Sequence, residues 1–188
     1  MDYNFFLLKI EQLSPVDVDD LLNTALNLDY SKNNTFWNMQ RHVGIDGLIL
    51  PPKQSLPVLE RLMNRPSFRD IFPAADRFIN YEIDRLHPGG VIAEHTDSYT
   101  IKQGCALIHR LHIPLVGSAN YMFRRDPTCS WTTEHMEIGS VYLFNNSVLH
   151  SVVNPNGHTR INLMLNIEDD KMESKARLYD KFNVSWRF

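Results

Sequence analysis

The spacing of His95, Asp97 and His150 is the feature that most constrains how this chain can fold. Side chains at positions i and i+2 of a β-strand point to the same face, so His95 and Asp97 can reach one bound ion while Thr96 points away. His150 lies far along the sequence. Only a fold that brings distant strands together can place these three side chains at a common point.

Two histidines and one carboxylate form a ligand set that holds one face of a non-haem Fe(II) and leaves the opposite positions open for oxygen and a co-substrate. Arg160 opens an apolar segment shortly after His150, and its planar guanidinium matches a carboxylate. The pattern therefore predicts a metal site of His95, Asp97 and His150, with Arg160 binding a co-substrate carboxylate. Such a site is typical of an oxygenase.

Other interpretations of these residues stay open from the motif alone. A single His-x-Asp pair is common by chance, and His95 could be a hydrogen-bonded histidine at a strand end. Arg160 could pair with a surface acid, and the ligand types do not exclude Zn(II) or Mn(II). The combination is more informative, because segments 91–94 and 139–144, which are rich in apolar residues, lead into the two histidines.

The chain from residue 78 onward is rich in short apolar segments separated by Gly, Pro and Asn, a pattern that favours a β-sandwich or barrel. Segment 78–86 alternates apolar and polar residues, with Glu82 and Asp84 on the polar side, which predicts a half-buried strand. Residues 87–90 are expected to make a tight connection into the metal-bearing strand. The remaining strands are expected at 91–94, 106–116, 120–125, 131–136, 140–144, 151–154 and 160–167.

The flanking segments are expected to be partly helical. Ser14 and Pro15 predict a helix N-terminus, and further elements are expected as strands at 4–10 and 43–50, a short helix at 55–63, turns at 65–73 and a charged helix at 168–182. A length of 188 residues suits one domain. We expect a single domain, with α+β support in 1–77, a β core in 78–168 and a C-terminal helix in 169–188.

Three blocks of the sequence resemble the Fe(II)/2-oxoglutarate-dependent dioxygenases, and within them the aspartyl/asparaginyl β-hydroxylase-like group. The blocks are the strand ending in His95-Thr96-Asp97, the segment 109–115 containing Arg110 and His112, and the segment from Gly139 through His150 to Arg160. The resemblance implies a double-stranded β-helix, a jelly-roll or cupin-like core with iron at its mouth. It also implies Fe(II), 2-oxoglutarate and O2 as cofactor and co-substrates, with Arg110 and His112 facing the 2-oxoglutarate pocket.

The resemblance further implies hydroxylation of a C–H bond, in an amino acid or a peptidyl side chain, with release of succinate and CO2. The best-known members of the group keep the two histidines but lack the carboxylate that Asp97 supplies here, as it does in similar free-amino-acid hydroxylases. This difference weakens the transfer of an aspartyl or asparaginyl substrate, and it argues against halogenation, which needs that position vacant. The alternatives are a non-catalytic cupin-like binding or sensing protein and a Zn- or Mn-dependent enzyme of other chemistry.

Other polar and aromatic residues near these motifs have two interpretations each. Tyr121, Met122 and Trp131 are expected to be ordinary core residues, with cavity lining as the alternative. Residues 145–147 either orient His150 or only form the turn before it. Arg124 and Arg125 are expected at a solvated strand end, with contact to an acidic substrate as the alternative. No role is assigned to His42, His87, His135 or His158.

Composition and charge limit the classes of partner that this protein is expected to bind. The net charge is -3, with no basic surplus to suggest nucleic-acid binding, and no segment is long and apolar enough to suggest a membrane span. The start of the chain lacks the features of a signal peptide, and Cys105 and Cys129 are expected to be reduced thiols, with a disulfide as the alternative. We expect a cytoplasmic protein that acts on a small molecule or a peptide.

Overall fold

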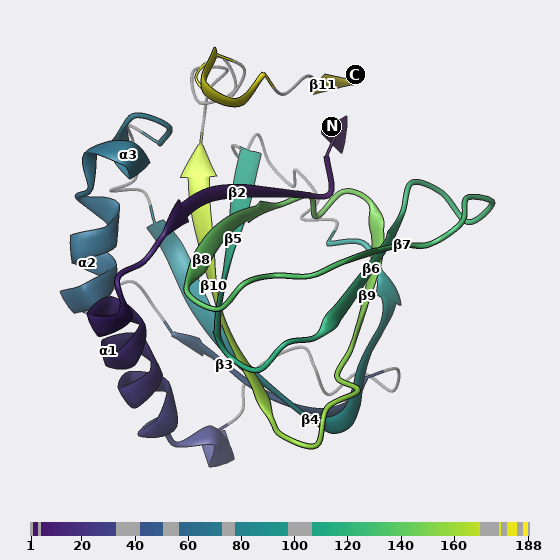
Figure 1. Cartoon of the computed structure of the whole chain (residues 1–188), viewed down its shortest axis with the longest axis horizontal. Coiled ribbons are helices and arrows are strands. Elements are labelled where there is room, and N and C mark those ends of the chain that lie inside the picture. Colours follow the sequence, from purple (N-terminus) through teal and green to yellow (C-terminus); the bar gives the residue numbers. More distant parts are fainter. Residues whose placement is uncertain are drawn as a thin grey trace.

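A computed structural model of the chain describes residues 2–3, 5–32, 42–50, 57–72, 78–97, 107–169, 177, 180–183 and 186–187 (Figure 1). The helices are α1 (Pro15–Leu26), η1 (Tyr30–Lys32), α2 (Pro57–Met63) and α3 (Pro66–Arg69). The strands are β1 (Asp2–Tyr3), β2 (Leu7–Gln12), β3 (Val43–Leu50), β4 (Phe78–His95), β5 (Leu107–Val116), β6 (Asn120–Arg124), β7 (Thr132–Glu134), β8 (Ser140–Phe144), β9 (Leu149–Val153), β10 (Arg160–Asp169) and β11 (Trp186–Arg187).

Within these residues, nine strands form one antiparallel sheet in the order β2-β8-β5-β10-β4-β9-β6-β7, with β3 also paired to β4. The long strand β4 joins the two parts of this sheet. Its first half pairs with β10 and β3, and its last residues pair with β9. The sheet therefore curls around an interior, while α1 and α2 lie along its outer side (Figure 1). The mostly β, barrel-like fold predicted from the sequence is confirmed.

Strands β5 and β10 bury both of their faces. Leu111 and Ile113 of β5, like Leu163 and Leu165 of β10, belong to the core between the sheet and the helices. The alternate positions of the same strands point into the barrel and are polar, as Arg110 shows, yet they are also buried. The prediction of a half-buried β4 is therefore wrong, because Glu82 and Asp84 on its polar side are only 6% and 1% exposed.

Helix α1 begins as the sequence predicts. The backbone N–H of Asp17 donates to the Ser14 hydroxyl oxygen at 3.2 Å, and Pro15 occupies the first turn. Leu21 and Ala25 face the sheet and are buried. The predicted strand at 43–50 is confirmed as β3, and the predicted short helix corresponds to α2.

Residues 87–90 do not form the expected turn, since β4 continues through them as a strand. The pairing of β3 with β4 shifts register here, and Gly44 has a φ of +65°. A Cβ atom on Gly90 would lie 2.8 Å from the Gly44 carbonyl oxygen. The glycine is therefore needed for close approach of two strands rather than for a turn.

Other element boundaries differ by a few residues. Pro66–Arg69 forms α3 where only turns were expected, and β9 starts at Leu149, so that His150 lies inside a strand. Strand β10 runs to Asp169, beyond the expected start of the C-terminal helix. Arg177 and residues 180–182 are helical, and the rest of that predicted helix lies outside the described residues or in β10. Among the described residues, no helix is both long and apolar enough to cross a membrane.

Candidate metal and co-substrate site

The structure brings His95, Asp97 and His150 together at one end of the barrel. His95 ends β4 and lies opposite His150 in β9. His95 Nε2 is 3.4 Å from Asp97 Oδ1, and His150 Nε2 is 3.9 Å from Asp97 Oδ2. The donor atoms of all three residues lie within 4.8 Å of one another. Metal bonds of about 2.1 Å place neighbouring donors roughly 3–4 Å apart, so this spacing suits a single ion.

The backbone sets the orientation of both imidazole rings. The Nδ1 atom of His95 lies 2.7 Å from the Ala93 carbonyl oxygen, and the Nδ1 atom of His150 lies 2.9 Å from that of Val148. A carbonyl can only accept, so each Nδ1 carries the proton and each Nε2 is directed at the cluster. Burial lowers the pKa of His95, but the neighbouring Asp97 carboxylate outweighs this effect and raises it. Burial lowers the pKa of His150 to about 4, which keeps that ring neutral and able to coordinate a metal at neutral pH.

Asp97 is held as a charged carboxylate. Its Oδ2 atom accepts from Arg110 Nη1 at 2.5 Å, and its backbone N–H donates to the Asn146 carbonyl oxygen at 3.0 Å. Burial alone would raise the pKa of Asp97, but Arg110 and the two histidines outweigh it and lower that pKa. The turn after β8 thus helps to position Asp97 through its backbone, a contact the motif did not indicate.

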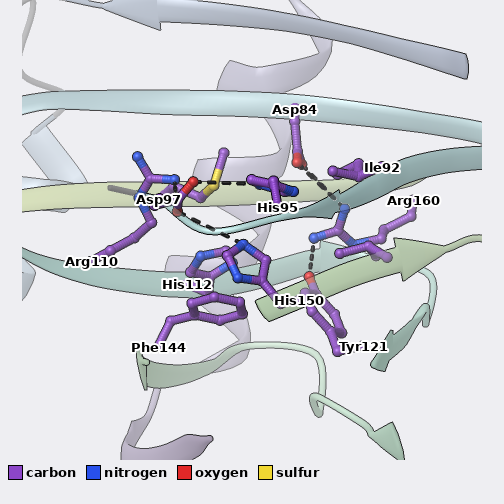
Figure 2. Close-up of a pocket in the computed structure, with 12 residues that line it drawn as sticks. Asp84, Ile92, His95, Asp97, Arg110, His112, Tyr121, Phe144, His150 and Arg160 are labelled. Carbon is purple, nitrogen blue, oxygen red and sulfur yellow. Dashed lines mark hydrogen bonds and ion pairs between the residues drawn. The ribbon is translucent and has the colours of Figure 1, made fainter. Parts of the chain in front are cut away.

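A pocket leads from these three residues into the barrel. It is lined by Asp84, Ile92, His95, Asp97, Arg110, His112, Tyr121, Phe144, His150, Val152, Arg160 and Met164 (Figure 2). All six residues predicted for metal or co-substrate binding therefore share one cavity.

Arg160 extends into this pocket and is only 1% exposed. Its Nη2 donates to the Tyr121 hydroxyl, and its Nη1 lies 3.4 Å and 3.5 Å from the two carboxylate oxygens of Asp84 (Figure 2). Burial lowers the pKa of the guanidinium, but Asp84 and Tyr121 more than compensate and raise it. Arg160 is thus a fixed, buried cation rather than the partner of a surface acid.

His112 has an unsatisfied ring nitrogen. Its Nδ1 atom lies 3.2 Å from the Asn162 side-chain amide nitrogen, and its Nε2 atom has no hydrogen-bond partner among the described residues. Burial, followed by repulsion from Arg110 and Arg160, lowers the pKa of His112 well below its usual value, so the ring is neutral. With Asn162 donating to Nδ1, the proton lies on Nε2 as a donor for a pocket ligand.

Asp84 was not predicted as a site residue, and Tyr121 was expected to belong to the ordinary core. The available signal was the polar side of the strand before the metal-bearing segment, but it was interpreted as solvent-exposed. Met122 and Trp131 do not line the pocket; Trp131 is 39% exposed and stacks on Arg124, with 4.5 Å between the guanidinium carbon and the ring centre.

Arg124 is paired rather than solvated, since it donates to Glu94. His42, which was given no role, lies beside the site, with its ring centre 5.6 Å from that of His95. Asn145 is buried and donates to the Phe5 carbonyl oxygen at 2.9 Å. This hydrogen bond holds the turn before β9 against the segment that precedes β2. Cys129 is free and exposed, whereas Cys105 lies outside the described residues.

Solved structures share this fold. A prolyl-4-hydroxylase from Pseudomonas putida has a TM-score of 0.60 at 14% identity, covering 89% of this chain and 92% of its own. HygX from Streptomyces hygroscopicus, solved with nickel and 2-oxoglutarate, has a TM-score of 0.62 at 12% identity, covering 87% and 82%. SnoN, a non-haem α-ketoglutarate-dependent epimerase from nogalamycin biosynthesis, has a TM-score of 0.65 at 15% identity, covering 87% and 76%. At these identities the likeness establishes the fold, and the predicted cupin-like, jelly-roll core is confirmed.

The family is established by sequence. The family model described as aspartyl/asparaginyl beta-hydroxylase matches residues 25–170, well over half of the chain. The chain belongs to this family and is an enzyme, as the three sequence blocks predicted. No curated protein matches the chain.

Proposed function

We propose that this protein hydroxylates a C–H bond of an amino acid or a peptidyl side chain, using Fe(II), 2-oxoglutarate and O2. The general reaction class follows from the family: the chain is a 2-oxoglutarate-dependent dioxygenase. The observation that carries the assignment of the metal and co-substrate residues is the shared cavity. It holds a His-Asp-His donor set and, away from it, a buried guanidinium.

In this proposal His95, Asp97 and His150 hold Fe(II). Two neutral imidazoles and one charged carboxylate are the ligands that a non-haem iron prefers, with open positions left for co-substrates. The two carbonyls that bind the Nδ1 protons keep both rings oriented, and Arg110 keeps Asp97 ionised. When bound, Fe(II) would support oxidation by O2, with one oxygen atom entering the substrate as a hydroxyl group while 2-oxoglutarate is oxidised to succinate and CO2.

Arg160 is proposed to bind the distal carboxylate of 2-oxoglutarate. A buried guanidinium held by Tyr121 is already ordered, so little entropy is lost when a carboxylate binds it. His112 Nε2 supports the same assignment, because a buried donor with no partner among the described side chains needs one from a ligand. Arg110 also lines the pocket, but its contact with Asp97 gives it a role in holding the metal ligand.

The substrate is proposed to be an amino acid or a peptide on the basis of the family alone. The Asp97 carboxylate, which completes the triad, favours hydroxylation over chemistry that needs a vacant ligand position. Neither a binding or sensing protein nor a zinc or manganese enzyme is favoured by a specific contact in the structure.

The test is an anaerobic visible absorption titration of metal-free protein, first with Fe(II) and then with 2-oxoglutarate. A weak charge-transfer band that requires both additions is expected for the natural chain. The band should be lost in His95→Ala but kept in His135→Ala, an exposed histidine outside the pocket. Succinate release on addition of amino acids and short peptides would then identify the substrate.

A titration with no band and no 2-oxoglutarate affinity would refute the proposed function. The binding or sensing protein and the enzyme using another metal would then be the better explanations. Retention of the band in His95→Ala would refute the ligand assignment alone.

A further inference from the structure

Asp84 is a buried acid inside the pocket with no role in the proposed chemistry. Its side chain lies next to Arg160, and its carboxylate oxygens are 3.4 Å and 3.5 Å from one guanidinium nitrogen. Those distances are longer than the 2.7–2.9 Å of a strong charge-assisted hydrogen bond. Asp84 therefore faces the same cation to which a co-substrate carboxylate is proposed to bind (Figure 2).

Binding of a dicarboxylate would add a negative charge next to the Asp84–Arg160 ion pair. Before binding, Arg160 and Asp84 balance each other in a water-poor environment. A second carboxylate on Arg160 would leave two negative charges beside one positive charge, with both acids out of bulk water. Two carboxylates that share one buried site do not both stay ionised, so one of them takes up a proton.

Other ionisable groups around Asp84 are less suited to take this proton. Burial raises the pKa of Tyr121 to about 12, so its hydroxyl is already protonated, and the pKa of His112 lies well below its usual value. On β3, the Asp46 carboxylate is already bound by Arg85 and His87. Among the described residues, the other ionisable groups near Asp84 are Arg110 on β5, which is paired with Asp97, Glu82 on the same face of β4, and Tyr30 of η1.

We propose that binding of the distal carboxylate of 2-oxoglutarate to Arg160 is coupled to the uptake of one proton from solvent by Asp84. This inference rests on the proposed function of the same pocket. The Asp84 carboxylate becomes a neutral carboxylic acid, which can donate its new O–H to the bound carboxylate. The net charge around Arg160 then stays at zero in both states.

The direction of the pKa of Asp84 agrees with this geometry. Burial raises that pKa, and the attraction of Arg160 and Arg110 only partly offsets the effect. Protonation of Asp84 is thus already easier than for an exposed aspartate before any ligand arrives. A ligand that occupies Arg160 would raise the pKa further, because it weakens the largest of the interactions that favour the charged form.

Calorimetric titration of 2-oxoglutarate into the Ni(II)-loaded protein tests the coupling. The heat is measured at one pH in buffers of different ionisation enthalpy, which gives the number of protons taken up. We expect close to one proton for the natural chain, and affinity that weakens as pH rises, by up to about tenfold per pH unit. Asp84→Asn should take up no proton and bind with little pH dependence, whereas Asp46→Asn on the neighbouring strand should behave like the natural chain.

Infrared difference spectra of the natural chain provide a measurement that needs no variant. Addition of 2-oxoglutarate should produce a carboxylic acid C=O band that shifts in D2O. Binding without proton uptake and without this band would overturn the inference while leaving the proposed function intact. The same proton count in Asp84→Asn as in the natural chain would overturn it as well. Failure of 2-oxoglutarate to bind the metal-loaded natural chain would instead refute the proposed function.

Discussion

Replacing Arg160 by Met should destabilise the fold far more than the same change at Arg85. Removal of one partner from a buried ion pair leaves an uncompensated charge and lowers the free energy of unfolding by about 3–5 kcal/mol. Asp84 and Arg160 have side chains that are each 2% exposed, so the full penalty applies. For a chain of this size, each kcal/mol shifts the unfolding midpoint by about 2–4 °C, which gives a loss of about 6–20 °C.

Arg85 is the matched control on the strand that carries Asp84. It pairs with Asp46 at 2.8 Å, a shorter distance than the 3.4 Å between Arg160 and Asp84, but the two side chains are 29% and 36% exposed. An exposed pair contributes about 0–1 kcal/mol, and the stacking of Arg85 on Tyr30 adds on the order of 1 kcal/mol. Distance alone would rank the two arginines in the opposite order, so the comparison tests burial as the deciding factor.

The measurement is urea unfolding at pH 7, followed by circular dichroism, for both single variants and for Arg160→Met combined with Asp84→Asn. The Asp84→Asn change removes the unpaired buried charge and should restore about 2 kcal/mol or more of the free energy of unfolding. Without Arg160, the pKa of Asp84 in the folded state lies above its unfolded value, so the stability of Arg160→Met should rise as pH falls from 7 towards 5. Equal losses in Arg160→Met and Arg85→Met, or no rescue by Asp84→Asn, would refute this reasoning.

Three further predictions concern the metal, the co-substrate and the packing of β4. His95→Ala should lower metal affinity by at least roughly 100-fold and abolish turnover, yet keep the circular dichroism spectrum; retained turnover would contradict its role as a ligand. Tyr121→Phe removes the hydroxyl that accepts from Arg160 and should weaken 2-oxoglutarate binding about 5–10-fold in calorimetry, so unchanged affinity would show that this contact is not needed. Gly90→Ala should cost about 1–3 kcal/mol in urea unfolding, because its Cβ would lie 2.8 Å from backbone oxygens, whereas Gly157→Ala has nothing within 4 Å and should be nearly neutral; equal effects would count against the close approach of β3 and β4.

The residues proposed as metal ligands could be identified from the sequence because they stand in patterns that involve only neighbouring residues. The strand period alone places His95 and Asp97 on one side of the chain. His150 and Arg160 stand at the boundaries of apolar segments, where strands begin or end. The start of α1 was predictable for a similar reason, since Ser14 and Pro15 act on the backbone next to them.

Position within the pocket was less predictable. Tyr121 and Met122 are neighbours in sequence, yet only Tyr121 lines the cavity. Their alternation follows from the strand period, but which of the two faces inward depends on the direction in which the sheet curls. Similarly, the glycine at position 90 suggested a turn, whereas its role is to let β3 approach β4.

The sequence by itself determined the alternation of the strands, the residues proposed as metal ligands and the family of this protein. Only the tertiary structure decided that the polar side of β4 faces a cavity instead of water. The physical reason is that burial is not a local property: helices cover the apolar face of the sheet, and the curl of the sheet encloses the opposite face. That enclosure places Asp84 of β4 against Arg160 of β10, and it turns an ordinary polar strand position into a buried acid beside the proposed co-substrate site.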